Sequence, residues 1–172
     1  FYTMRQDYKP YKIPNFGYPK LRFNLIVEYT DGSRETVSSD TNWRLTADGP
    51  IRTNNEYDGE EYDARKELKG WTTVGYDDSS WKPAERVGIP DGTLRAVMTP
   101  NMKIVAKVNP VSIKKVGDKY IMDMGQNMAG WIRMKIKGAA GDSIRLRFGE
   151  LLQENGELYV RNLRDARVTD IY

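Results

Sequence analysis

Apolar and polar residues alternate along much of the chain, which is the pattern of β-strands. In residues 21–29 every second residue from Leu21 to Tyr29 is apolar, and most of the residues between them are polar. This period of two predicts a half-buried strand. Asp31-Gly32 follows, a dipeptide that favours a two-residue type I′ turn, so residues 33–39 are expected to return as the partner strand.

Two further hairpins are predicted in the second half of the chain. Residues 111–124 alternate on both sides of Gly117-Asp118, which is expected at the turn. Residues 130–137 and 143–148 alternate on both sides of a Gly- and Ala-rich loop, with apolar residues that can share one core face. We therefore expect three hairpins in all.

Helical periodicity is poor throughout. The best candidate, residues 61–68, has no apolar stripe and lies between Gly59 and Gly70. Residues 77–80 are short and polar, and predict a turn that can cap a brief helix carrying Trp81. Many short strands separated by Gly, Pro and Asp-Gly turns favour an all-β fold of antiparallel β-sandwich units.

A boundary between two such units is expected near residues 95–101, where Pro and Gly interrupt the alternation. We therefore expect one β unit over residues 1–96 and a second over residues 97–172, the second incomplete at its C-terminal end. The chain opens on Phe1 rather than Met, which favours a segment of a longer protein.

Composition narrows the chemistry that is open to the chain. Cysteine and histidine are both absent, which excludes thiol nucleophiles, Ser-His-Asp triads and the usual zinc sites. Carboxylate chemistry, Ser-Lys chemistry and an oxygen-ligated ion such as calcium remain open. The net charge is only +3 and no nucleic-acid-binding motif is present, so we expect no nucleic acid partner. No apolar run approaches the roughly 20 residues of a membrane span, so we expect no membrane partner.

Seven phrases in a fixed order carry a resemblance to a known family. They are WRLTADGPI (43–51), GEEYDAR (59–65), GW (70–71), YDDSSW (76–81), DMGQNMAGW (123–131), GDSIRLRFGELL (141–152) and GELYVRNLRDARVTDIY (156–172). Together they resemble the non-catalytic N-terminal region of bacterial α-L-rhamnosidases. The resemblance implies a jelly-roll-like sandwich over residues 1–96 and a truncated concanavalin-like domain over residues 97–172.

The resemblance also implies a function. It indicates an accessory region of an inverting glycoside hydrolase that acts on terminal L-rhamnose of glycans or glycosides. The catalytic carboxylates are expected in an (α/α)6 barrel farther along the same parent chain, so we expect no catalytic residue here and no activity from this chain alone. The implied partners are rhamnose-containing carbohydrate and that barrel. The alternative is a carbohydrate-binding module for L-rhamnose-containing polysaccharide, with or without calcium. The cellular compartment stays open between cytoplasmic and exported.

The candidate site lies in residues 55–71, which hold six carboxylates and end on a tryptophan. The candidate carbohydrate-binding residues are Glu60, Asp63, Arg65 and Trp71, because charged groups bind hydroxyls and an indole packs on a sugar ring. Asp63 is also the candidate calcium ligand, since some resembling modules bind L-rhamnose through calcium. The structural alternative is a buried Asp63–Arg65 pair that fixes a loop, with Glu60 accepting backbone N–H groups.

Catalysis by this stretch is the least favoured alternative. Glu61 and Asp63 would lie about 7 Å apart on one face of a strand, within the range for an inverting glycosidase. Any strand with this spacing meets that distance, however, and no apolar pocket is evident that would raise one pKa. A complete small enzyme based on paired carboxylates is therefore disfavoured.

Each tryptophan can be interpreted as a core residue or as a sugar-binding residue. Core packing is expected for Trp43, Trp81 and Trp131, whereas Trp71 fits a core position and an exposed sugar-binding face equally well.

Basic residues line the polar face of the third predicted hairpin, and a solvated face is favoured over a site for an anionic partner. These residues are Arg133, Lys135, Lys137, Arg145 and Arg147.

Overall fold

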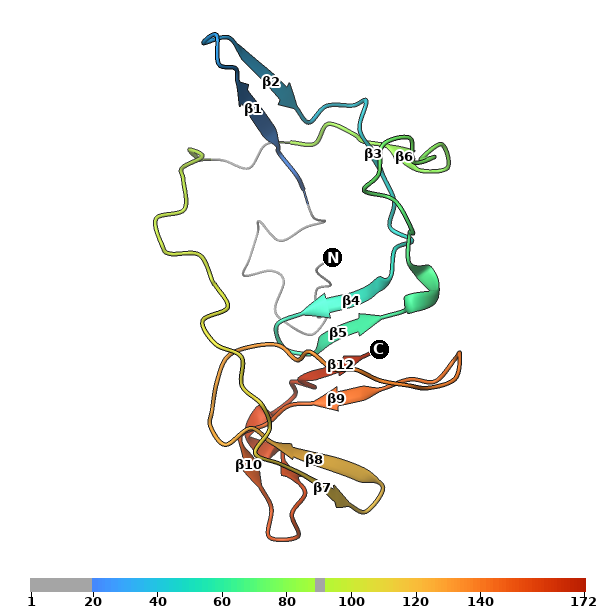
Figure 1. Cartoon of the computed structure of the whole chain (residues 1–172), viewed down its shortest axis with the longest axis vertical. Helices are drawn as coiled ribbons and strands as arrows, with labels where there is room; N and C mark the ends of the chain where they lie inside the picture. The colour runs from blue at the N-terminus through green and yellow to red at the C-terminus, as the bar shows by residue number, and fades with distance from the viewer. Residues whose placement is uncertain (1–19, 89–91) are drawn as a thin grey trace. The chain divides into compact units, whose positions relative to one another are not determined.

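The computed structural model describes residues 20–88 and 92–172 (Figure 1). Within these ranges the chain consists of short β-strands, loops and single turns of 3-10 helix, and every pairing with a recorded register is antiparallel. The predicted all-β, antiparallel fold class is thus confirmed. No helix in the described part of the chain has the length and apolar character needed to cross a membrane.

The chain divides into two compact units, which we describe separately. The first runs to Asn55, resumes over residues 60–88 and includes Tyr172, and the second comprises Glu56–Gly59 and Thr93–Ile171. In the first unit and at its edge lie β1 (Asn24–Glu28), β2 (Arg34–Ser38), β3 (Arg44–Leu45), β4 (Ile51–Asn55), β5 (Gly59–Tyr62), the 3-10 turn η2 (Ala64–Lys66) and β6 (Lys82–Pro83). The second unit holds β7 (Ser112–Val116), β8 (Lys119–Asp123), β9 (Arg145–Arg147), β10 (Leu151–Leu152), β11 (Leu158–Tyr159), the 3-10 turn η3 (Arg161–Leu163) and β12 (Thr169–Ile171).

Strands β1 and β2 form the first predicted hairpin, but the turn type is different. The Tyr29 N–H donates to the Ser33 carbonyl at 2.9 Å and the Gly32 N–H donates to the Tyr29 carbonyl at 3.0 Å, so the loop holds three residues. A type I′ turn would require positive φ at both central residues. Gly32 has φ +84°, but Asp31 lies outside the positive region and accepts hydrogen bonds from Ser33 instead. The type I′ prediction is therefore wrong.

The other strands of the first unit bring sequence-distant segments together. Strand β3 pairs with β6 across a separation of nearly forty residues, with Arg44 opposite Pro83. Strands β4 and β5 are neighbours, and the Asp63 N–H donates to the Pro50 carbonyl at 2.8 Å just beyond them. The predicted turn before Trp81 is present, with the Trp81 N–H donating to the Asp78 carbonyl at 2.9 Å, but it does not continue into a helix.

In the second unit, β7 and β8 form the second predicted hairpin. Ser112 lies opposite Asp123 and Val116 opposite Lys119, so the connection is the predicted Gly117-Asp118 dipeptide. This hairpin agrees with the sequence because its two strands and its turn are all local. Strands β10 and β11 form a further short antiparallel pair, which was not predicted.

The third predicted hairpin does not form. Residues 130–137 contain no strand, and β9 pairs instead with β12, with Arg147 opposite Thr169 (Figure 1). The loop between the predicted strands does turn, because the Ala139 N–H donates to the Asp142 carboxylate at 2.7 Å. The alternation of residues 143–148 thus predicted a strand correctly, but the predicted partner strand was wrong. Alternation does not identify the partner, because any neighbouring strand with an apolar face on the same side fits the pattern.

Side-chain burial is shallow in both units. Across residues 20–88 and 92–172 no hydrophobic side chain is buried, and the one buried polar residue is Asn55, at 8% exposure. Aromatic pairs provide local packing in the first unit, with ring centroids 5.5 Å apart for Phe23 and Trp43. Trp131, which was expected in a core, is 73% exposed. That prediction is wrong because residues 130–137 lack the partner strand that would cover the ring.

Candidate functional site

The first unit contains an open groove of about 700 Å³. It is formed by the segment from the end of β3 to the start of β4, the last residue of β5, the loop after η2, and Trp81. Aromatic, aliphatic and polar side chains share its lining. The lining residues are Leu45, Thr46, Ala47, Gly49, Pro50, Ile51, Tyr62, Glu67, Leu68, Lys69, Gly70, Trp71, Thr72 and Trp81.

Three aromatic side chains shape this groove. Trp71 is 60% exposed, whereas Trp81 is half-buried. Tyr62 is held from two directions, because its ring stacks on Tyr172 at 5.4 Å and its hydroxyl donates to Glu67 Oε1 at 3.0 Å. Burial, and then the hydrogen bond to Glu67, raise the pKa of the Tyr62 hydroxyl above its ordinary value, so it stays protonated as a donor.

A series of tight turns places Trp71 at the surface. The Trp71 N–H donates to the Leu68 carbonyl at 3.2 Å, and the Thr73 N–H and hydroxyl both donate to the Gly70 carbonyl, at 2.9 and 2.6 Å. Gly70 has φ +81°, a conformation that glycine adopts without the steric cost of a Cβ. Glycine thus precedes Trp71 because the backbone at position 70 adopts a positive φ.

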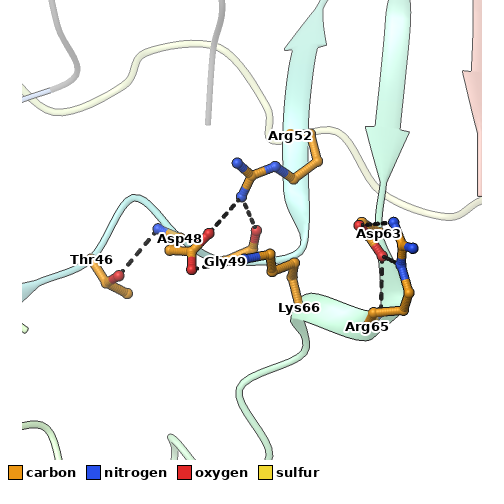
Figure 2. A network of polar contacts seen from close by, with 7 residues as sticks. All are labelled: Thr46, Asp48, Gly49, Arg52, Asp63, Arg65 and Lys66. Carbon is orange, nitrogen blue, oxygen red and sulfur yellow. Dashed lines mark hydrogen bonds and ion pairs between the residues drawn. The ribbon is translucent and has the colours of Figure 1, made fainter. Parts of the chain in front are cut away.

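Asp63 and Arg65 form the predicted pair, but it is not buried. Asp63 Oδ1 accepts the Arg65 backbone N–H at 3.0 Å and its Nε at 2.8 Å, while Oδ2 accepts Nη2 at 2.8 Å (Figure 2). The Arg65 side chain is 82% exposed and that of Asp63 24%. Chiefly through the side-chain hydrogen bonds from Arg65, the pKa of Asp63 falls to about 2. The prediction of a buried pair is wrong because η2 turns outward and carries Arg65 into solvent.

A second polar network lies beside the groove (Figure 2). Asp48 accepts hydrogen bonds from Lys66 Nζ at 3.0 Å and from Arg52 Nη1 at 3.2 Å, and Arg52 also donates to the Gly49 carbonyl at 2.9 Å. The Asp48 N–H donates to Thr46 Oγ1 at 3.1 Å. Lys66, and to a smaller degree Arg52, lower the pKa of Asp48. Because Thr46 and Gly49 line the groove, this network fixes one of its edges.

The metal-binding capacity of these residues is small. In the described part of the chain, no three acidic side chains are grouped so that they could hold a metal ion. Both Asp63 oxygens accept donors from Arg65, so a calcium ion there would compete with a guanidinium. The Glu60 carboxylate accepts a hydrogen bond from Asn54 Nδ2 at 2.6 Å, a side-chain partner that the sequence did not predict.

The sequence matches two family models in succession. Residues 1–106 match the α-L-rhamnosidase N-terminal domain, and residues 113–172 match the bacterial α-L-rhamnosidase concanavalin-like domain. The chain belongs to the α-L-rhamnosidase family. It carries the N-terminal and concanavalin-like parts of that family, and the resemblance stated from the seven phrases is confirmed.

Known α-L-rhamnosidases resemble the chain over nearly all of its length. It is 38% identical over 163 residues to one from Streptomyces avermitilis, covering 90% of this chain and 15% of that protein. It is 37% identical over 158 residues to one from Formosa agariphila, covering 90% and 17%. The α-L-rhamnosidase structure from Dictyoglumus thermophilum has a TM-score of 0.86 at 39% identity, covering 92% of this chain and 18% of that one.

A second solved structure, the Streptomyces avermitilis α-L-rhamnosidase complexed with L-rhamnose, has a TM-score of 0.74 at 36% identity. The likeness covers 87% of this chain and 15% of that one. The chain therefore spans less than a fifth of these family members.

The four candidate residues do not form one rim in this rhamnosidase-family chain. Asp63 and Arg65 are joined to each other, Glu60 is bonded to Asn54, and Trp71 alone of the four lines the groove. Their role in sugar binding stays a prediction.

Sequence reasoning missed two groove residues and misjudged a third. Tyr62 and Glu67 stand in the same acidic stretch, five residues apart across η2, and that spacing was the signal that could have linked them. Trp81 was expected to pack in a core, and it is half-buried with one side lining the groove.

Proposed function

We propose that this chain is the non-catalytic N-terminal accessory region of an α-L-rhamnosidase that acts on terminal L-rhamnose of glycans or glycosides. The observation that carries the proposal is the succession of the two family models along the chain, residues 1–106 and then 113–172. Relatives of the same family are more than five times longer than the matched segment, which leaves room for a catalytic domain elsewhere. The partner we propose is an (α/α)6 barrel of the same parent chain, and we keep the division at residues 96 and 97 as part of the proposal.

The chemistry of Asp63 supports a non-catalytic role. An inverting glycosidase needs one carboxyl group that stays protonated near neutral pH, which requires a raised pKa. Asp63 has the opposite property, because Arg65 holds its pKa at about 2. In the Glu61–Asp63 pair that the sequence spacing allowed, Asp63 therefore cannot serve as the general acid.

An aryl α-L-rhamnoside assay tests this proposal. The 172-residue chain alone should give no turnover above buffer, whereas a longer protein that carries the chain and extends to the length of the relatives should hydrolyse the substrate. Glu61→Gln and Asp63→Asn should leave that turnover largely intact. Hydrolysis by the 172-residue chain that either substitution abolished would contradict the accessory role.

A second candidate function is a carbohydrate-binding module for L-rhamnose-containing polysaccharide. The observation that favours it is the exposure of Trp71, the one aromatic member of the predicted set Glu60, Asp63, Arg65 and Trp71. Calorimetric titration of L-rhamnose in calcium and then in chelator tests this set, with Arg65→Ala as the diagnostic variant. Loss of binding in chelator and in Arg65→Ala would assign the site to the acidic residues and a calcium ion at Asp63.

A further inference from the structure

The β7–β8 hairpin of the second unit is a two-stranded ribbon whose more apolar face lies in solvent (Figure 1). Opposite residues of an antiparallel pair project to the same side, and successive residues alternate between the two sides. In the register, Ile113 lies opposite Met122. Lys115 lies opposite Tyr120, two positions farther along, and therefore on the same side. Val111 precedes β7 in the same alternation, and we call these five residues the outer face.

The outer face is exposed although four of its five residues are apolar. Val111 is 68% exposed, Ile113 57%, Tyr120 68% and Met122 37%. The opposite side of the hairpin, the inner face, has two apolar residues among six, and both of them are half-buried. The inner-face residues are Ser112, Lys114, Val116, Lys119, Ile121 and Asp123. An antiparallel sheet with one solvated face normally turns its polar face to water, so we expect the outer face to be covered by another polypeptide surface.

The second unit already packs against the inner face. Lys119 Nζ donates to Glu157 Oε1 at 3.4 Å, and a Cβ placed on Gly156 would lie 3.9 Å from Val116 Cγ2. The loop between β10 and β11 therefore lies against this side of the hairpin. Because the inner face has its contacts within the unit, the outer face is the side that is left for a partner.

We propose that the outer face docks the (α/α)6 barrel of the parent protein, against an apolar surface that carries a carboxylate opposite Lys115. This inference rests on the proposed function, because the barrel is the partner named there. The length of the relatives favours this occupant. The chain covers 15% and 17% of two α-L-rhamnosidases, so most of such a protein lies outside the matched segment and can supply the covering surface.

The charge of the outer face disfavours a second copy of this chain. Lys115 is the one charged residue of that face, which holds no carboxylate. In a symmetric dimer formed through this face, each Lys115 would meet only apolar residues and the ammonium of the other copy. A buried ammonium without a partner is unfavourable. A different surface that has both apolar residues and a carboxylate suits the whole outer face.

Acetylation of two adjacent lysines tests the proposal, because Lys114 and Lys115 lie on opposite faces of one strand. A longer protein that carries this chain and extends to the length of the relatives is labelled with N-hydroxysuccinimidyl acetate, in parallel with the 172-residue chain. Mass spectrometry measures the rate at each lysine. In the longer protein Lys115 should react about tenfold more slowly than Lys114, because it is covered except during local opening. In the 172-residue chain the two rates should be similar.

A carbodiimide cross-link identifies the occupant. The reagent joins Lys115 Nζ to a carboxylate in direct contact, with formation of an amide bond and net loss of water. In the longer protein the linked carboxylate should belong to the barrel. A link to a second copy, detected in a mixture of isotopically light and heavy protein, would overturn the proposal. A link to the first unit of the same chain would also overturn it.

The double variant Ile113→Ser/Tyr120→Ser tests whether apolar contact holds the barrel on this face. In the longer protein it should raise the acetylation rate of Lys115 to nearly that of Lys114. In the 172-residue chain it should leave circular dichroism and Tm almost unchanged, because both side chains are exposed. Val74→Ser is the matched control, since it removes a fully exposed apolar residue of the first unit and should leave Lys115 protected.

Equal acetylation rates for Lys114 and Lys115 in the longer protein would overturn the proposal. Slow acetylation of Lys115 in the 172-residue chain that became slower with protein concentration would assign the outer face to a second copy and also reject it. Hydrolysis of an aryl α-L-rhamnoside by the same preparation separates this inference from the proposed function. Turnover with unprotected Lys115 would reject only the docking, whereas protected Lys115 without turnover would reject only the rhamnosidase proposal.

Discussion

Two neighbouring parts of one acidic stretch differ in what they leave available to a ligand. In residues 59–66, Asp63 binds Arg65, Lys66 binds Asp48 from outside the stretch, and Glu60 accepts a hydrogen bond from Asn54. In residues 67–72 a turn series exposes the indole of Trp71 beside an open groove. The sequence suggested a candidate site across both parts, with Glu60, Asp63 and Arg65 in the first and Trp71 in the second. In the structure, the first part lines the groove only through Tyr62, whereas the second part lines it through Glu67, Leu68, Lys69, Gly70, Trp71 and Thr72.

The difference has an electrostatic origin. A carboxylate with a bidentate guanidinium partner has most of its acceptor capacity filled, and its low pKa records that arrangement. An exposed indole has no comparable partner in its own turn, and its apolar face gains free energy when it is covered. Charged stretches that close on themselves are thus poor ligand sites, even when their composition suggests chemistry.

The largest expected effect is that of Gly59→Ala. This substitution tests whether close backbone packing, and not the charge pairs, stabilises the start of the acidic stretch. Gly59 has φ +94°, and a Cβ there would contact the Thr169 carbonyl oxygen and lie 2.7 Å from its carbon. Gly59→Ala should therefore destabilise the fold by about 3 kcal/mol, or roughly 6–12 °C in Tm. Thermal unfolding followed by circular dichroism measures the change.

Gly32→Ala is the matched control for that substitution. Gly32 has a similar φ of +84°, but a Cβ there would meet nothing within 4 Å. It should show only the cost of the backbone conformation, about 1 kcal/mol. Equal Tm values for the two alanine variants would show that the close approach to Thr169 does not matter.

Asp63→Ala should have the next largest effect. Asp63 is the N-cap of η2 as well as the partner of Arg65, so alanine removes a cap and an ion pair together. We expect Tm to fall by about 2–4 °C. Asp63→Asn retains an acceptor for the Arg65 N–H and should restore about half of the loss. A larger fall in Asn than in Ala would contradict the capping role.

Arg65→Ala should change stability less than Asp63→Ala. The cap hydrogen bond survives this substitution because it uses the Arg65 backbone N–H, and the guanidinium that is lost is 82% exposed. Exposed ion pairs contribute little, so a Tm shift of about 2 °C or less is expected. A shift as large as that of Gly59→Ala would mean that the pair is buried, as the sequence had suggested.

The smallest expected effect is a pH dependence. The pKa of Asp63 is about 2 in the folded chain, below its ordinary value near 3.8. A depressed folded pKa contributes stability that is present above the unfolded pKa and is lost as pH falls from about 4 through about 2. Over this window the chain should lose slightly more Tm than Asp63→Asn does. Parallel Tm curves for the two proteins would place the acid sensitivity at other carboxylates.

For residues 20–88 and 92–172, the sequence by itself predicted the all-β character and the two hairpins with short local turns. In β1–β2 and β7–β8, alternation and turn residues are contiguous, so side-chain period and backbone chemistry specify the pair together. The turn of β1–β2 was mistaken because Asp31-Gly32 fits both a two-residue and a three-residue loop, and only the hydrogen bonds of Tyr29 distinguish them.

The tertiary structure alone decided which strand pairs with β9, whether Trp131 is covered, and where the groove lies. The partner of β9 is β12, more than twenty residues away, and the groove joins residues 45–51 to residues 62–81. Alternation with a period of two residues shows which face of a strand is apolar, but many segments can cover that face equally well. The Asp63–Arg65 pair was predicted because its two residues are close in the sequence, but its exposure, like that of Trp71, was decided by the structure.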